Sequence, residues 1–340
     1  GIAMPATVQA ILAARIDRLA GEDKRLLQAA AVVGKDVPFA LLFAIADVDE
    51  ESLRHALGRL QTAEFLYETQ LFPELEYTFK HALTHEVAYG GLVTERRRAL
   101  HAALVGAIEH LHADRLDEHV ERLAHHAVQG QLRDRAAAYL HQAGARAAAR
   151  YANREALTLF EQVLPVLTEL PESPETLART TDVRLALATT HTQIRGPGSP
   201  EAEASYLCAR ELADRLGEPA RLYQALWGLW YVNLGRGQYP SARELGEQLL
   251  VIAQRENDTG RLLEAHHALW PTLSAMGEPT AALLHLEQGL ALYDPERHAS
   301  QALLYGGHDA GVCCRFYLSR TQWVLGYPDR AAATMREALG

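Results

Sequence analysis

Cysteine is scarce in this sequence, and the spacing of Cys208, Cys313 and Cys314 is not that of a disulfide framework. Long apolar runs are lacking as well, because Arg, Glu or His interrupts each apolar stretch before the roughly 18 residues that a bilayer requires. The first residues do not combine a basic segment with an apolar one, as a secretory signal does. These absences predict a soluble, cytoplasmic protein in a reducing compartment, with no membrane as a partner.

Three motifs of nucleotide and metal chemistry are also missing. The sequence contains no Gly-x-x-x-x-Gly-Lys-Ser/Thr phosphate loop, no Gly-x-Gly-x-x-Gly and no His-Glu-x-x-His. We therefore expect no catalytic residue, no metal and no cofactor that this chain binds by itself. A binding or regulatory role is favoured over an enzymatic one.

Acidic residues outnumber basic ones along the whole chain. There are 33 Lys and Arg against 43 Asp and Glu, which gives a net charge of −10. Counted separately, residues 1–112 hold 11 basic and 15 acidic residues, and residues 113–340 hold 22 and 28. Domains that bind nucleic acids usually present a basic face. DNA is therefore not an expected partner.

The first third of the chain predicts short helices followed by a β-hairpin. Residues 1–20 form a leading helical segment, and three further helices are expected over 21–34, 38–45 and 49–60 from their apolar spacing and end signals. Alternating strands at 64–69 and 75–79, joined by a turn at Phe72–Pro73, then form the hairpin, or wing. Helices closed by a hairpin indicate a winged-helix domain over residues 21–112.

Many winged helices bind DNA, which makes a transcription regulator one alternative function. The recognition helix would be residues 49–60, and such helices address DNA with their first residues. Here those residues are Asp49, Glu50 and Glu51, whose carboxylates repel phosphates. The charges therefore oppose this alternative.

From residue 113 onward the chain repeats a phrase that starts with a small residue and ends, five residues later, with alanine. It occurs as Gly237–Ala242, Gly277–Ala282 and Gly326–Ala331. Weaker copies are Tyr151–Ala156, which starts with a large residue, and Gly198–Ala202, which is one residue shorter. The phrase alanines, Ala156, Ala202, Ala242, Ala282 and Ala331, are 46, 40, 40 and 49 residues apart. This period predicts a tetratricopeptide-like superhelix of helical hairpins over residues 113–340.

Histidine, a common metal ligand, is abundant in this sequence, with 16 copies. His81 and His85 stand one helical turn apart but lack an evident third ligand, so a metal-dependent hydrolase using them with Glu86 is a second alternative. A chelating patch can also be drawn from His119, His125, His126 and His141 on two successive predicted helices. Because chance clusters are common among so many histidines, no metal site is predicted.

Aromatic residues recur at matching positions of the predicted hairpins. Most of them are expected in the core, but some residues of a superhelix line its concave groove and contact a partner. The groove candidates are Trp227, Trp230, Tyr231, Trp270 and Trp323. The expected partner is a protein, a peptide or a small effector.

Four phrases resemble one family of large bacterial signalling proteins: Pro5–Leu19, Lys24–Pro38, Phe72–Tyr89 and His285–Pro295. Those proteins join an adenylate/guanylate cyclase domain, an AAA-like ATPase of the signal-transduction (STAND) type, a winged helix and tetratricopeptide-like repeats. The resemblance covers essentially the whole chain and only the downstream part of such a parent. Neither the cyclase nor the phosphate loop of the ATPase lies within it.

The resemblance implies a regulatory fragment whose repeats sense an effector and whose winged helix controls a nucleotide-dependent switch. In STAND ATPases a histidine at the end of the wing can touch the phosphates of bound ADP. His81 matches that position, and Lys80 beside it is a weaker candidate. ATP or ADP is thus an expected ligand only together with an upstream ATPase domain.

Overall fold

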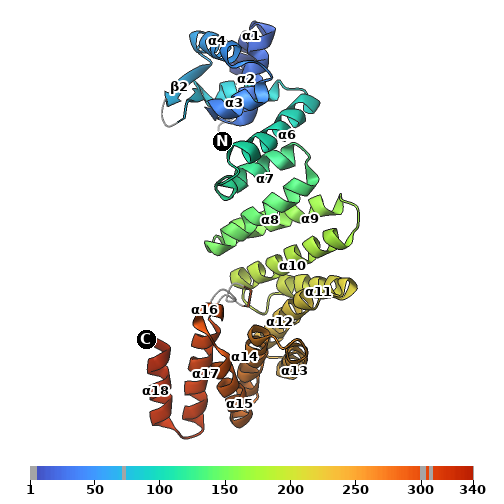
Figure 1. The fold of residues 1–340 in the computed structure, drawn as a ribbon, viewed down its shortest axis with the longest axis vertical. Helices are drawn as coiled ribbons and strands as arrows, with labels where there is room; N and C mark the ends of the chain where they lie inside the picture. The colour runs from blue at the N-terminus through green and yellow to red at the C-terminus, as the bar shows by residue number, and fades with distance from the viewer. Residues whose placement is uncertain (1–5, 71–73, 299–303, 306–308, 340) are drawn as a thin grey trace. The chain divides into compact units, whose positions relative to one another are not determined.

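The computed structural model describes residues 6–70, 74–298, 304–305 and 309–339 and divides the chain into two compact units (Figure 1). Unit 1 is Gly1–Gln142 and unit 2 is Ala143–Gly340. The expected turn at Phe72–Pro73 lies outside the described residues. In the part of the chain that is described, every helix is too short or too polar to cross a membrane.

Unit 1 is mainly helical and contains one small sheet. Its elements are α1 (Ala6–Asp17), α2 (Gly21–Val33), β1 (Asp36–Pro38), α3 (Phe39–Ala46), α4 (Glu50–Thr62), β2 (Leu66–Gln70), β3 (Glu76–Phe79), α5 (Ala82–Gly90), α6 (Thr94–Leu111), the 3-10 turn η1 (Leu116–His119), α7 (Val120–Gln129) and α8 (Arg133–Ala149), which continues into unit 2. The three helices predicted after the leading segment agree with α2, α3 and α4 within two residues, since their apolar spacing and end signals are local.

The sheet is antiparallel and has the order β1-β3-β2. The hairpin of β2 and β3 confirms the predicted β-hairpin, and its register pairs Leu66 with Phe79. β1 was not predicted, because three residues are too few to show an alternating pattern. Tyr77 and Phe79 are buried while Thr78 between them is half-buried, so one face of β3 packs on the helical core.

The division at Gln142 lies 30 residues after the domain boundary expected at residue 112. The intervening chain is tied to α6 by side chains from α7 and α8. His126 on α7 hydrogen-bonds His101, and the Tyr139 hydroxyl donates to Glu109 Oε1 at 2.6 Å. The repeat pattern of the sequence could not reveal these contacts, because they join residues far apart in the chain.

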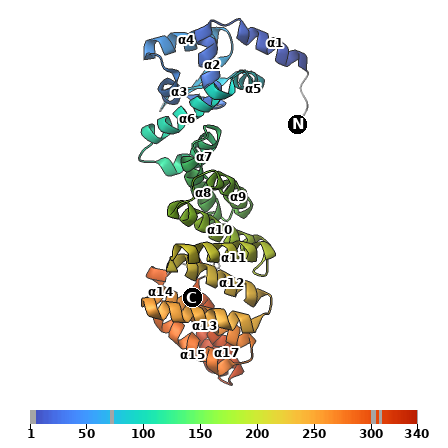
Figure 2. The same ribbon diagram turned by 90° about the vertical axis from the view of Figure 1, so that its right-hand side faces the viewer.

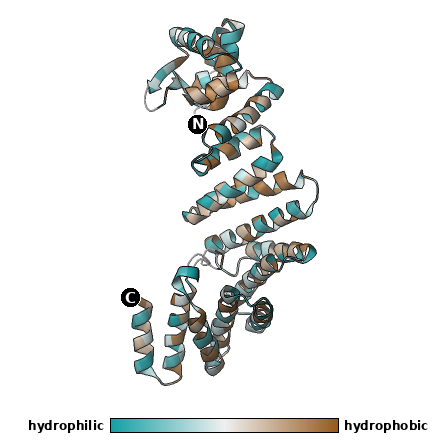
Figure 3. Cartoon of the chain, in the orientation of Figure 1, coloured by the Kyte–Doolittle hydropathy of each residue, from teal (hydrophilic) through white to brown (hydrophobic). Residues whose placement is uncertain are grey.

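Unit 2 consists of consecutive helices, most of which contact the next one along the chain (Figures 1 and 2). They are α9 (Asn153–Thr168), α10 (Pro174–Arg195), α11 (Pro200–Leu216), α12 (Pro219–Gly235), α13 (Tyr239–Glu256), α14 (Thr259–Ala275), α15 (Pro279–Leu292), the short α16 (Pro295–His298), α17 (Ala310–Val324) and α18 (Pro328–Leu339). Most helices carry both hydrophilic and hydrophobic residues, as Figure 3 shows. This amphipathic character lets each helix bury one stripe against its neighbours.

The repeated phrase marks the turns and the close helix contacts of unit 2. Gly237, Gly277 and Gly326 adopt positive φ angles of 71°, 80° and 90° just ahead of α13, α15 and α18. Glycine enters this left-handed region without a steric penalty, which allows the chain to reverse between two helices. The five phrase alanines, Ala156, Ala202, Ala242, Ala282 and Ala331, are all buried. The predicted mainly helical, tetratricopeptide-like repeat fold is therefore confirmed for unit 2.

The core of unit 2 is centred on α14. Twelve of its 17 residues are buried, although the helix includes two histidines and a glutamate. Trp270 on this helix packs against Gly289 of α15, where a Cβ atom would lie 2.5 Å from the indole ring. Gly289 therefore makes room for the largest side chain of α14. A helix this deeply buried places its polar residues inside the unit.

Candidate functional site

Three polar side chains meet in the core of unit 2. The ring of His267 lies between Glu264, one turn earlier on α14, and Cys313 on α17. His267 Nδ1 is 2.9 Å from Glu264 Oε2, and its Nε2 is 3.4 Å from Cys313 Sγ. His267 and Glu264 are 2% and 3% exposed, whereas Cys313 is half-buried. The imidazole thus bridges a carboxylate and a thiol through its two nitrogens.

The two partners of His267 decide its charge. Burial alone would lower the pKa of His267, but the sulfur of Cys313 and the carboxylate of Glu264 raise it to about 10. A protonated imidazole donates from both nitrogens, which suits a carboxylate on one side and a sulfur on the other. The arrangement therefore stabilises an imidazolium ion. A histidine that activates a neighbouring thiol takes its proton and forms the same ion.

The neighbouring thiol has no such partner. Burial raises the pKa of Cys314 to about 12, and its Sγ donates to the Leu286 carbonyl at 3.2 Å. Cys314 is therefore a packing residue. Cys313 differs from it because its sulfur lies beside His267. Sequence reasoning missed His267 and Glu264, since 46 residues separate the histidine from the thiol and no motif connects them.

Aromatic rings enclose this trio. His267 stacks on Trp270 with ring centroids 4.9 Å apart, and Trp227 and Trp230 each lie 5.9 Å from it. Trp227 and Trp230 are 1% exposed and Trp270 is fully buried. These three groove candidates must be corrected to core residues, because their rings fill the space between helices. The Trp230 indole also donates to Thr272 Oγ1 at 2.9 Å.

The two remaining groove candidates have some accessible surface. Tyr231 is half-buried and packs against Trp227 and Trp230. Trp323 is 67% exposed and borders an open apolar cleft of about 310 Å³ between α17 and α18. Of the five aromatic candidates, only Trp323 therefore presents most of its side chain to solvent.

A larger open cleft of about 760 Å³ lies over α11, α12 and α13. Its apolar floor is formed by Leu222, Leu226, Val251 and Ile252, and its polar rim by Arg210, Asp214, Glu244, Glu247 and Gln248. Val251 is 46% exposed, so the floor is open to solvent. The rim has three carboxylates against one guanidinium, which makes this cleft predominantly negative. Sequence analysis did not predict it, since its residues come from three helices.

The nucleotide-contact candidates lie where β3 leads into α5. His81 is exposed and occupies the N-cap of α5 with extended backbone angles and no side-chain capping bond. Lys80 is half-buried, and its Nζ lies 2.8 Å from Glu64 Oε1 and 5.4 Å from the centre of the Tyr67 ring. The imidazole is thus presented at the start of a helix, where the N–H groups favour anions, while the ammonium group already has a carboxylate partner.

His85, which the sequence places one helical turn after His81, has a structural role. His85 Nε2 lies 2.9 Å from the Ala31 carbonyl, and its ring meets that of Phe79 edge-on at 5.1 Å. His85 therefore ties α5 to α2. In the described residues, the group of three metal-capable ligands is found at His101, His125 and His126. The hydrolase alternative built on His81, His85 and Glu86 has no support in this arrangement.

The expected recognition helix corresponds to α4. The side chain of Asp49 caps this helix by accepting from the Ser52 N–H at 2.8 Å, and Glu50 binds Arg54 at 2.7 Å. The exposed Glu51 has an exposed histidine, His55, 3.8 Å away. The start of α4 is therefore acidic and engaged in its own capping, as the sequence indicated.

Comparison with known proteins supports the fold without placing the chain in a family. No known family profile matches the chain. An uncharacterised protein of Rhizobium meliloti (strain 1021) is 27% identical over 331 residues, which are 96% of this chain and 32% of that protein. The chain thus spans about a third of the length of the curated relative that it matches.

Solved structures of repeat proteins resemble the chain. The apo form of RapI has a TM-score of 0.51 and 12% identity, covering 85% of this chain and 69% of RapI. A Rap protein complexed with competence and sporulation factor has a TM-score of 0.50 and 10% identity, covering 98% and 76%. A STAND protein with a tetratricopeptide repeat sensor from Pyrococcus horikoshii covers 99% and 65% at 10% identity, but its TM-score of 0.36 is too low to carry an argument. The chain therefore has a fold similar to that of tetratricopeptide-like repeat proteins.

Proposed function

We propose that this chain is a non-catalytic regulatory and protein-interaction module, and that unit 2 binds a peptide segment of a partner protein. The observation that carries the proposal is the open cleft over α11, α12 and α13, which combines an apolar floor with an acidic rim. A Rap protein of similar fold is seen in complex with competence and sporulation factor, which supports partner binding by such a scaffold.

The cleft favours one kind of occupant, a basic amphipathic helix. Its floor residues Leu222, Leu226 and Val251 would cover the apolar face of such a helix. The carboxylates of Asp214 and Glu244 are exposed at the rim, where they would meet Lys or Arg. Glu247, which binds Arg243 at 2.9 Å, contributes less free charge. An acidic partner would be repelled by the same rim.

Unit 1 would connect this binding event to a nucleotide switch. The order α2, β1, α3, α4, β2 and β3 supports the interpretation of unit 1 as a winged helix, in which the hairpin would be the wing. His81 is exposed just after the wing and is free of a capping bond, so its imidazole could donate to a phosphate held by a neighbouring ATPase domain. The parent protein would then be a STAND-type signalling ATPase or nucleotide cyclase, with this chain as its regulatory part.

Peptide binding by the cleft is testable with a labelled 15-residue helix made of Leu and Lys and its Leu and Glu counterpart. Fluorescence anisotropy with the full chain should show binding of the basic peptide only, weakened by added salt because the contacts are partly ionic. Val251→Glu should weaken binding at least tenfold, since it places a carboxylate on the apolar floor.

The matched control is Leu284→Glu, which adds the same charge at a residue of α15 that is 60% exposed and lies outside the cleft. Its affinity should stay within twofold of the unchanged chain. Equal losses in both variants, or equal binding of both peptides, would show non-specific attraction and reject the cleft as the site.

The role of His81 requires the chain joined to a P-loop ATPase domain. In such a protein, His81→Ala should speed ADP release, because one phosphate contact of the resting state is lost. Glu86→Ala, a substitution of another exposed residue on α5, is the control. Unchanged ADP release in His81→Ala would contradict the proposed nucleotide contact. The separate proposal that unit 2 binds a peptide would not be affected by that result.

A further inference from the structure

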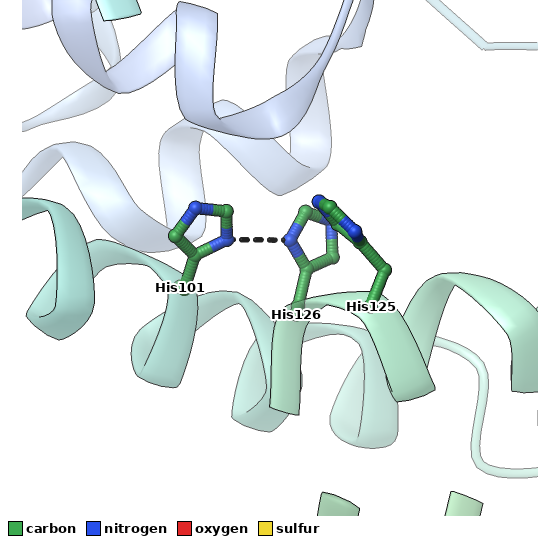
Figure 4. A group of neighbouring side chains, drawn as sticks. All are labelled: His101, His125 and His126. Carbon is green, nitrogen blue, oxygen red and sulfur yellow. Dashed lines mark hydrogen bonds between the residues drawn. The ribbon is translucent and has the colours of Figure 1, made fainter. Parts of the chain in front are cut away.

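Three imidazole rings gather inside unit 1. His101 projects from α6 toward His125 and His126, which are adjacent residues of α7 (Figure 4). One ligand nitrogen from each ring lies within 4.8 Å of the other two. His101 and His126 are 1% and 3% exposed, whereas His125 is exposed. The group therefore has two ligands in the core and one at the surface.

Hydrogen bonds orient the two buried rings. Nδ1 of His101 and Nδ1 of His126 are 2.8 Å apart, so one of them donates and the other accepts. Nε2 of His101 lies 2.9 Å from the Tyr89 hydroxyl. Burial lowers the pKa of His101 to about 4 and that of His126 to about 3, and the neighbouring imidazoles add to this effect. The nitrogen that accepts in this pair has a lone pair, which is what a metal ligand requires.

We propose that His101, His125 and His126 bind a zinc ion through one nitrogen each, with a fourth position open on the side of His125. Three neutral imidazoles are a ligand set that zinc uses, at Zn–N distances of about 2.0–2.1 Å. In a tetrahedral site the nitrogens stand about 3.3 Å apart. Nδ1 of His101 and Nδ1 of His126 would separate by about 0.5 Å from their present hydrogen bond to reach that geometry.

Tyr89 supplies the supporting contact that metal-bound histidines usually have. With Nδ1 of His101 on the metal, the ring proton resides on Nε2 and is donated to the Tyr89 oxygen. This fixes both the tautomer and the orientation of the ring. The guanidinium of Arg97 lies over the Tyr89 ring at 5.5 Å.

The type of ligand, and not the surrounding charge, favours a nitrogen-binding metal at the three rings. Arg97 and Arg122 are the nearby cations, and Arg122 donates to the Val33 carbonyl at 3.1 Å. The ligand set contains no carboxylate, so calcium and magnesium, which prefer oxygen ligands, are excluded. Zinc is expected to bind, and copper more tightly by the usual order of affinities.

Zinc alone is the probe for this site. The full chain, stripped with a chelator and desalted, should bind one zinc ion in competition with a chromophoric chelator, and cobalt should give the visible absorption of a tetrahedral complex. His125→Ala should weaken binding at least tenfold without unfolding the chain, because this ring is exposed. Tyr89→Phe should weaken it by about 10–100-fold through the lost supporting contact.

The control is His119→Ala, which removes an imidazole that stacks on His112 at 4.0 Å in the same unit and lies outside the group. It should leave zinc binding unchanged. Since the chain has 16 histidines, adventitious binding is the competing outcome. Stoichiometry and affinity that stay the same in His125→Ala and Tyr89→Phe, or the absence of zinc binding to the unchanged chain, would overturn the proposal.

Discussion

At the scale of single residues, the chain holds buried histidines in two opposite charge states. His101 and His126 face each other and cationic side chains, and burial keeps their pKa values low. His267 is as deeply buried, yet Glu264 and Cys313 raise its pKa to about 10. Burial penalises the charged form in all three cases, so the neighbouring group decides the outcome. Residue type and burial alone therefore do not predict charge.

Removing the carboxylate partner of His267 should destabilise unit 2. Glu264→Gln leaves a buried imidazole without its anionic partner, and we expect a loss of about 3 kcal/mol in the free energy of unfolding. Urea unfolding followed by tryptophan fluorescence measures this directly, since all four tryptophans lie in unit 2.

The control for this substitution is Glu172→Gln, which breaks an exposed ion pair with Arg215 in the same unit. Exposed pairs contribute little, so its effect should stay below about 1 kcal/mol. A loss in Glu264→Gln no larger than that of the control would mean that His267 is not charged in the folded chain.

At the scale of helices and turns, the glycines of the repeated phrase have a backbone role. Gly277 has a φ of 80°, and no other atom lies within 4 Å of the place where its Cβ would be. Space is therefore available for a side chain, and only the left-handed conformation opposes one. The same conformation is adopted in unit 2 by Asn257, which has a φ of 52° at the end of α13.

This comparison predicts a graded effect of substitution at Gly277. Gly277→Ala should cost about 1 kcal/mol, because residues with a Cβ are disfavoured at positive φ. Gly277→Asn should cost less than half of that, since asparagine tolerates this region. Tryptophan-detected urea unfolding of both variants provides the measurement. If the asparagine variant is the less stable of the two, the loss of stability on substitution must come from steric contact of the side chain and not from the backbone conformation.

At the scale of the whole molecule, the two units should respond differently to alkaline pH. The folded pKa of His267 lies above its unfolded value of about 6.5, so its contribution is complete below pH 6.5 and is lost as pH rises toward 10. The buried histidines of unit 1 have lowered pKa values and are already uncharged in this range. The alkaline loss that arises from histidine is therefore specific to unit 2.

We expect unit 2 to lose about 3.5 kcal/mol between pH 7 and pH 10 while unit 1 changes little. Tryptophan fluorescence reports unit 2 in urea titrations at each pH. A hydrogen-exchange pulse at fixed pH, read by mass spectrometry on peptides of α2 and α6, reports unit 1. Parallel losses in both units, or a flat profile for unit 2, would contradict this assignment. The Glu264→Gln variant should show a shallower dependence.

Much of the fold was accessible from local sequence patterns, whereas most of the candidate site was not. The helices α1 to α4, the hairpin and the repeats were predicted because apolar spacing, capping residues and turn glycines act over a few positions. Three of the five residues predicted as groove candidates, Trp227, Trp230 and Trp270, are instead buried in the core. The repeat period alone does not distinguish a helix face that packs in the core from one that lines a groove.

The sequence by itself determined the helices, the hairpin and the repeat period, because each depends on residues that are neighbours along the chain. Only the tertiary structure decided which distant side chains meet. It brought His101 to His125 and His126 across two helices, and His267 to Cys313 over 46 residues. The physical reason is that a pKa or a metal affinity depends on distances through space, and those distances are set by how helices pack.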